Sequence, residues 1–125
     1  MATKLWVNDA LQILAESFAP VPHELNELDW KARFSDQRDR LAEHLMAFAN
    51  HPNGGYLVFG VDNDGKATGV DQTQITSIVG QLSNLGRDAV APPLALDHAV
   101  AEAPDGTPLL LVRIPESPVK PAHRR

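Results

Sequence analysis

The sequence predicts an α+β fold in which a mixed β-sheet of about five strands has three helices packed on it. Three stretches carry apolar residues at helical spacing, and short apolar or alternating runs between them read as strands. The predicted order is α β α β β α β β, which is neither a regular βαβ alternation nor an all-β repeat. This order favours a mixed sheet covered by helices.

One stretch, residues 47 to 65, organises the rest of the chain. The Gly54-Gly55 pair accepts positive φ, so a helix is expected to end just before it. The run from Tyr56 to Val61 is almost entirely apolar, as in a central strand covered on both faces. The sequence Asp62-Asn63-Asp64-Gly65 that follows is typical of a hairpin turn.

The residues before this stretch predict two helices and one strand. A first helix over residues 1 to about 19 has Asn8 as its expected N-cap, and a proline linker follows to residue 22. Apolar and polar side chains alternate over residues 28 to 33, as in a half-buried strand. A second helix is expected from about residue 36 to 50, and its buried stripe consists of Leu41, Leu45, Phe48 and Ala49.

The residues after the acidic turn predict a short return strand over residues 66 to 70 and a third helix. Asp71 or Thr73 is the expected N-cap of this helix, and Gly86 is expected to follow its last turn. The apolar face of the helix consists of Ile75, Ile78, Val79, Leu82 and Leu85.

The last two strands are expected at residues 94 to 100 and 108 to 114, and a proline-spaced, extended and unpaired segment follows them. We therefore divide the chain into three parts. Residues 1–22 form an N-terminal helix and proline linker, residues 23–118 form the main domain, and residues 119–125 form a basic extended tail.

The composition is that of an ordinary globular protein of 125 residues, with 43% hydrophobic and 22% charged residues. The absence of cysteine excludes disulfides and thiolate zinc sites, and it is consistent with a cytoplasmic location. No run approaches the roughly 20 apolar residues of a membrane span, so no membrane partner is expected.

The formal net charge of -5 bears on the kind of partner that the chain binds. Proteins that bind nucleic acid through their overall field are usually basic, and this chain is not. Any contact with nucleic acid must therefore come from a local basic patch, or from carboxylates that hold a bridging metal.

Four segments carry a resemblance to a known family. They are Glu24-x-x-x-Leu28-Asp29-Trp30-Lys31, the stretch from Ala47 through Gly54-Gly55 to Asp62, Gly65-x-x-x-Gly69-Val70, and Leu111-Val112-Arg113-Ile114-Pro115-Glu116-Ser117. In their order and spacing these segments resemble the Schlafen AlbA_2 domain, over about residues 23 to 118. The resemblance implies the mixed α+β fold of that family.

The resemblance also implies a function. Bacterial and archaeal members are described as DNA-binding or transcription-regulator domains, whereas vertebrate Schlafens carry the domain in a core that cleaves RNA with three carboxylates and a divalent metal. The corresponding positions here are Glu24, Asp29 and Asp62, with Asp64 as an alternative to Asp62. Asp29 departs from the family pattern, which has Glu at this position.

Carboxylates at these positions suit Mg²⁺ or Mn²⁺, because both ions prefer hard oxygen ligands. The alternative is that Glu24 and Asp29 are solvated and that Asp62 is only a turn residue. Lys31 and Arg33 share the polar face of the strand with Asp29, where they are candidates to hold phosphates. Asn50 and Arg113 are further candidates for nucleic-acid binding. Arg38 and Arg40 are interpreted as solvated surface residues.

Three functions remain open at this stage, and whether the chain is an enzyme is among the open questions. The first is a nucleic-acid-binding, regulatory domain of AlbA_2 type. The second is a metal-dependent nuclease that uses Glu24, Asp29 and Asp62 on RNA or single-stranded nucleic acid. The third is a non-enzymatic assembly domain whose first helix and truncated final strand would complete a homodimer, because an unpaired strand edge invites a partner.

Overall fold

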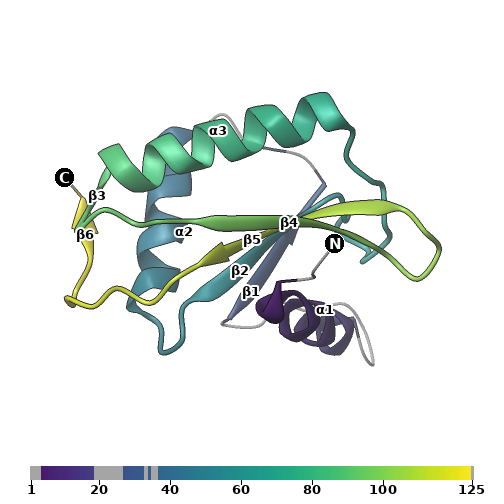
Figure 1. Cartoon of the computed structure of the whole chain (residues 1–125), viewed down its shortest axis with the longest axis horizontal. Helices are drawn as coiled ribbons and strands as arrows, with labels where there is room; N and C mark the ends of the chain where they lie inside the picture. The colour runs from purple at the N-terminus through teal and green to yellow at the C-terminus, as the bar shows by residue number, and fades with distance from the viewer. Residues whose placement is uncertain (1–3, 19–26, 33, 35–36, 125) are drawn as a thin grey trace.

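The computed structural model describes residues 4–18, 27–32, 34 and 37–124. The elements in chain order are α1 (Leu5–Ser17), β1 (Leu28–Lys31), α2 (Arg38–Asn50), β2 (Gly55–Phe59), α3 (Gln72–Asp88), β3 (Val90–Ala91), β4 (Asp97–Glu102), β5 (Pro108–Ile114) and β6 (His123–Arg124). The predicted fold class is confirmed, because a mixed sheet carries all three helices (Figure 1).

The main sheet has the strand order β1-β2-β5-β4, and β3 and β6 form a separate two-stranded sheet. β1 and β2 run parallel, with Asp29 opposite Leu57, because α2 carries the chain back between them. β5 runs antiparallel to both of its neighbours. Within the described part of the chain, β1 and β4 are therefore the edge strands of the sheet.

Each face of the sheet supports its own hydrophobic core. Leu57 and Phe59 of β2 point toward α2 and α3, whereas Tyr56 and Val58 point toward α1. All five residues of β2 are buried, so the prediction of a central strand is confirmed. The result is a sheet between two helical layers, with α1 on one side and α2 and α3 on the other (Figure 1). In the part of the chain that the structure describes, no helix is long and apolar enough to cross a membrane.

The glycine turn between α2 and β2 forms where the sequence predicts it. α2 ends at Asn50, and Asn53 and Gly54 take positive φ angles of 68° and 73°. A Cβ atom on Gly54 would lie 2.1 Å from the carbonyl oxygen of Ile114. Glycine is therefore needed at this position both for its backbone angle and for the close approach of β5.

The N-terminus of α3 is confirmed, and its predicted end is wrong. Asp71 forms a reciprocal capping box with Gln74, which settles the choice between Asp71 and Thr73. The helix continues past Gly86 to Asp88. A Cβ atom at residue 86 would lie 3.1 Å from the oxygen of Leu94, so this glycine serves helix packing and does not end the helix.

The predicted return strand over residues 66 to 70 is wrong, since only an isolated bridge joins Val61 and Ala67. The backbone N–H groups of this segment have other partners. Lys66 donates to the side chain of Asp62 at 2.9 Å, and Thr68 and Gly69 both donate to the Gly60 oxygen. They are therefore not available for a ladder of strand hydrogen bonds.

Three further boundaries differ from the prediction. α1 begins at Leu5 with Lys4 as N-cap, so Asn8 lies inside the helix. The strand expected from residue 94 begins at Asp97, because Leu94 instead donates its N–H to the Gly86 oxygen of α3. The C-terminal segment is not unpaired throughout, because His123–Arg124 pairs with β3.

Candidate nucleic-acid interface

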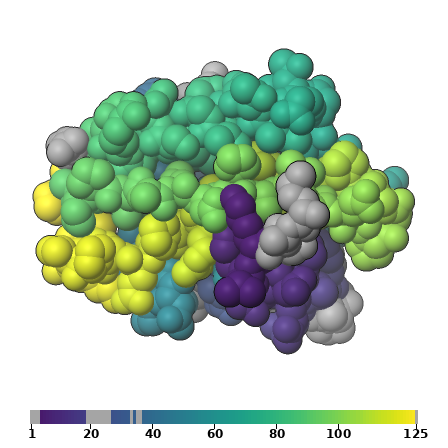
Figure 2. Space-filling model, viewed as in Figure 1, coloured from purple at the N-terminus to yellow at the C-terminus, as the bar shows by residue number. Residues whose placement is uncertain are grey.

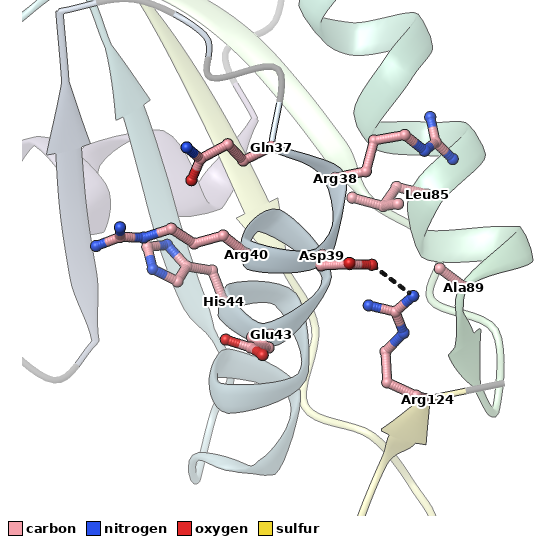
Figure 3. A pocket seen from close by; sticks show the side chains of 9 residues that line it. All are labelled: Gln37, Arg38, Asp39, Arg40, Glu43, His44, Leu85, Ala89 and Arg124. Carbon is pink, nitrogen blue, oxygen red and sulfur yellow. Dashed lines mark ion pairs between the residues drawn. The ribbon is translucent and has the colours of Figure 1, made fainter.

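A groove lies at the start of α2, beside the end of α3 and the C-terminal strand β6 (Figure 3). Its volume is about 1030 Å³. The residues that line it are Gln37, Arg38, Asp39, Arg40, Glu43, His44, Leu85, Ala89 and Arg124. Polar side chains from α2 dominate this lining, and the two apolar residues come from the end of α3 and the residue after it.

The side chains of α2 separate into two directions. Arg40 and His44 are four residues apart and point together toward the β1 side of the helix (Figure 3). They line a smaller adjoining pocket with Lys31 of β1. Arg38 and Asp39 point toward α3 and β6, where Asp39 Oδ1 lies 3.1 Å from the guanidinium of Arg124. The two pockets together form one surface that we call the α2 groove.

Four cations border the α2 groove: Lys31, Arg38, Arg40 and Arg124. Arg38 and Arg40 are exposed, and neither has an ion-pair or hydrogen-bond partner among the residues that the structure describes. The Asp39–Arg124 pair is solvent-exposed, so a phosphate can displace Asp39 at small cost. The groove thus gathers four cations on a chain whose net charge is -5, and its lining also carries the carboxylates of Asp39 and Glu43.

Asp29 lies below this surface on β1 and is only 9% exposed. Its Oδ2 atom is 3.2 Å from Nζ of Lys31 and 3.7 Å from Nδ1 of His44. The second contact is too long for a hydrogen bond. Within the described part of the chain, Asp29 Oδ1 is the one buried side-chain polar atom without a hydrogen-bond partner.

The environment of His44 favours its neutral form. Burial lowers the pKa of its imidazole, and the charge of Lys31 lowers it further, whereas Asp29 acts in the opposite direction. Near neutral pH the imidazole is therefore uncharged, and its contact with Asp29 is not an ion pair. The positive charge at this end of the α2 groove comes from Lys31 and Arg40.

Asp62 has a structural role in its turn. Its Oδ1 atom accepts hydrogen bonds from the N–H groups of Asp64 and Lys66, both at 2.9 Å. Its backbone oxygen accepts from the indole N–H of Trp30 at 2.9 Å. Asp62 follows the end of β2, whereas Asp29 lies in β1, opposite Leu57 in the middle of β2. The two carboxylates therefore come from different levels of the sheet.

Glu24, Asp29 and Asp62 are the predicted ligands of a divalent metal. Residues 4–18, 27–32, 34 and 37–124 contain no group of three His, Asp or Glu side chains that would hold a metal ion. Glu24, the third member of the predicted set, lies outside the described residues, so the three-carboxylate site stays a prediction. Of the two carboxylates that are described, only Asp29, with its partnerless oxygen, has the environment of a metal ligand.

The other predicted contacts are dispersed. Arg33 lies outside the described residues. The side-chain amide of Asn50 bonds the backbone of Ala122. Its Nδ2 atom donates to the Ala122 oxygen at 3.2 Å, and its Oδ1 atom accepts from the Ala122 N–H at 2.7 Å. Arg113 stacks 5.4 Å from the ring centroid of Tyr56 and donates to the Asn53 oxygen, in a separate pocket next to α1. Of the four predicted contacts for nucleic acid, only Lys31 is described at the α2 groove.

Sequence reasoning did not assign Arg38, Arg40, His44 and Arg124 to a site. One local signal was present, since Arg40 and His44 are spaced to share a helix face. Arg124 lies far from them in sequence and reaches the groove only because β6 pairs with β3. Periodicity along the chain does not reveal such a long-range contact.

The fold and the groove define a small α+β domain with a charged, arginine-bearing surface at the start of its second helix. A family model for Schlafen, AlbA_2 matches residues 24–125. The chain belongs to this family, as its sequence motifs predict.

Solved structures agree with this assignment. The solution structure of the N-terminal domain of an ATP-dependent DNA helicase RecG-related protein from Nitrosomonas europaea is 27% identical, with a TM-score of 0.68 over 93% of this chain and 80% of that one. The DIP2311 protein from Corynebacterium diphtheriae is similar in fold alone, at 15% identity and a TM-score of 0.57 over 93% of this chain and 23% of that one. A search among curated proteins found no match.

Proposed function

We propose that this chain is a nucleic-acid-binding domain that holds the phosphate backbone in the α2 groove. The observation that carries the proposal is the gathering of Lys31, Arg38, Arg40 and Arg124 around one groove of an acidic chain. Cations supply most of the affinity for a phosphate backbone, because they release its condensed counterions. The family and the RecG-related neighbour support a role with nucleic acid, and a regulatory or targeting role accords with the family resemblance.

The arrangement favours phosphates over bases as the groups contacted. Arginine side chains present planar donors that match phosphate oxygens. Arg38 and Arg40 have no described protein partner to displace. The α2 helix also directs its N-terminal N–H groups to this end, where anions are favoured. Binding of this kind depends on salt and discriminates little between sequences.

The test measures the binding of the whole chain to short labelled RNA, single-stranded DNA and duplex DNA by fluorescence anisotropy, from about 50 to about 200 mM salt. We expect Arg38→Ala/Arg40→Ala to weaken binding about 10-fold or more and to reduce the salt slope by about 1 to 2. Lys66→Ala removes an exposed cation outside the groove and should leave binding unchanged. The proposal fails if wild type does not bind at low salt, or if the double variant binds like wild type.

A metal-dependent nuclease is the second candidate. The observation in its favour is the buried Oδ1 atom of Asp29, which has no described partner next to the basic groove. Asp29, with Glu24 and Asp62 of the predicted set, would hold Mg²⁺ or Mn²⁺, which would polarise a phosphate and activate water, and Asp62 would have to give up its hydrogen bonds to the N–H groups of Asp64 and Lys66. Cleavage of RNA with Mn²⁺ that disappears in EDTA and in Glu24→Ala would support it. Binding without cleavage, or cleavage retained by Asp29→Ala, would count against it.

A further inference from the structure

We propose that the free edge of β4 pairs with the same edge of a second copy of this chain, antiparallel across a two-fold axis. Among the residues that the structure describes, β4 is the last strand of the main sheet and pairs on one side only, with β5. Its atoms form a green strip at the surface between α3 and α1 (Figure 2). The pairing would join two four-stranded sheets into one, and it is independent of the α2 groove.

The hydrogen-bonding pattern shows which backbone groups of β4 face outward. In the hairpin that joins β4 to β5, Ala103 donates to the Thr107 oxygen at 2.8 Å, so Ala103 turns its backbone groups toward β5. Such groups alternate along an antiparallel pair. Those of His98, Val100 and Glu102 therefore point away from β5. Outward-facing groups on an edge strand are a template for another strand.

At the start of this edge, the outward-facing backbone groups of His98 already have side-chain partners. The N–H of His98 donates to Asp97 Oδ1 at 2.9 Å, and its oxygen accepts from Nζ of Lys4 at 2.6 Å. Charged side chains placed in this way protect an edge from uncontrolled pairing. Among the described residues, Val100 and Glu102 have no such cover, so pairing is expected to centre on Val100.

The side chains of this edge complement themselves in a two-fold register. With Val100 opposite Val100 of the second copy, His98 lies opposite Glu102 of that copy, and the same pair occurs twice. The side chains of all three residues lie on the face of the sheet toward α3. His98 and Val100 are paired with Val112 and Leu110 of β5, and the side chains of these two residues belong to the core beneath α3. The contact would bury two valines that are each 51% exposed, and it would set an imidazole beside a carboxylate.

The contacts of His98 with Asp97 and Lys4 leave most of this pairing possible, because only the His98 N–H stays with Asp97 Oδ1 and its oxygen can accept a second hydrogen bond. The two Val100 residues exchange both of their hydrogen bonds in this register. The N–H of Glu102 reaches the His98 oxygen of the second copy, and a carbonyl oxygen has two lone pairs, so Lys4 does not block it. A six-residue edge buries less than the roughly 1,200–2,000 Å² of a stable interface, so the dimer is weak and concentration-dependent.

The absence of cysteine from the chain allows a direct test. Paired residues that exchange hydrogen bonds have Cα atoms about 5.5 Å apart, which suits a disulfide. We therefore expect Val100→Cys to form a covalent dimer several-fold faster under mild oxidation than Val119→Cys, a control at another exposed valine. Equal or slower cross-linking at residue 100 would overturn the proposal.

A second measurement does not depend on oxidation. Sedimentation equilibrium of the wild-type chain should show a dimer that increases with concentration. Val100→Lys sets two ammonium groups opposite each other and should remove the dimer while leaving the melting temperature unchanged. A wild-type chain that stays monomeric at millimolar concentration, or a Val100→Lys variant that dimerises equally, would contradict the proposal.

Discussion

The amide of Asn50, at the end of α2, bonds both backbone groups of Ala122 in the C-terminal segment. Its Nδ2 atom donates to the Ala122 oxygen at 3.2 Å, and its Oδ1 atom accepts from the Ala122 nitrogen at 2.7 Å. Arg124, two residues further along, lines the α2 groove. The sequence suggested Asn50 as a direct contact for nucleic acid. In the structure it instead holds the segment that places Arg124 at the groove.

The first prediction concerns this link. Asn50→Ala removes both hydrogen bonds and leaves polar groups of buried Ala122 without a partner, which should lower the free energy of unfolding by about 1–3 kcal/mol. Urea denaturation measures the change. Nucleic-acid affinity should fall to about that of Arg124→Ala. Asn63→Ala, at an exposed turn position, is the control and should change stability by less than about 0.5 kcal/mol. Equal stability of the two variants would rule out the structural role of Asn50.

The second prediction compares two glycines. Gly54→Ala should destabilise the chain by several kcal/mol, because φ is +73° and the new Cβ would lie 2.1 Å from the Ile114 oxygen. Gly80→Ala should instead stabilise it by about 0.5–1 kcal/mol, since Gly80 lies inside α3 with nothing within 4 Å of its Cβ position. Thermal denaturation distinguishes the two. A mild effect at residue 54 would show that β5 can move away.

The parts of the fold that the sequence predicted are those with a local cause. β2 was predicted because the run from Tyr56 to Val61 is almost entirely apolar, and the end of α2 because the Gly54-Gly55 pair accepts positive φ. β3 and β6 were not predicted, since each has two residues and their pairing joins distant segments. The return strand failed because its N–H groups have other partners: that of Lys66 donates to the Asp62 side chain, and those of Thr68 and Gly69 donate to the Gly60 oxygen.

The α2 groove was beyond sequence reasoning for a related reason. Its cations come from β1, α2 and β6, and only the fold brings these three elements together. The motif residues drew attention to Asp29 and Lys31, which do lie beside the groove. They gave no indication of Arg124. The short motifs therefore identified the part of the groove on β1, whereas Arg124 on the opposite side depends on the long-range pairing of β6 with β3.

The third prediction follows from the environment of His44. Its pKa in the folded chain is below the usual 6.5, so the unfolded chain binds more protons in the interval between the two values. Stability from this group is present above pH 6.5 and is lost as pH falls through that interval. The charged groups that act on it are Lys31, Asp29, Arg40 and Glu43.

Urea denaturation at about pH 7.5 and about pH 5.5 checks this prediction. Wild type should lose more stability between the two values than His44→Gln, which cannot take up a proton. Gln12→Ala, at an exposed position on α1, removes no titratable group and is the control, which should keep the pH dependence of wild type. An identical loss in wild type and His44→Gln would show that burial of His44 does not govern its protonation.

The fourth prediction concerns Asp97, which joins the start of α1 to β4. Its carboxylate accepts from Nζ of Lys4 at 2.5 Å and from the indole N–H of Trp6 at 2.9 Å. The hydrogen bond from Lys4 lowers the pKa of Asp97 to about 2, with smaller contributions from Trp6 and the His98 N–H. Stability from this group is therefore present above pH 3.8 and is lost as pH falls through about 2.

Asp97→Asn should consequently flatten the acid side of the stability curve, with a loss at neutral pH of under about 1 kcal/mol, because solvent screens a side chain that is 47% exposed. Trp6 lies beside the substitution and stacks on Tyr56, so tryptophan fluorescence during acid titration reports on the detachment of α1. Asn63→Ala, in the exposed turn, removes no titratable group and should keep the acid side of the wild-type curve. If Asp97→Asn also titrates like wild type, the contact with Lys4 does not hold α1 on the sheet, and the apolar contacts of Val7, Ala10 and Leu14 suffice.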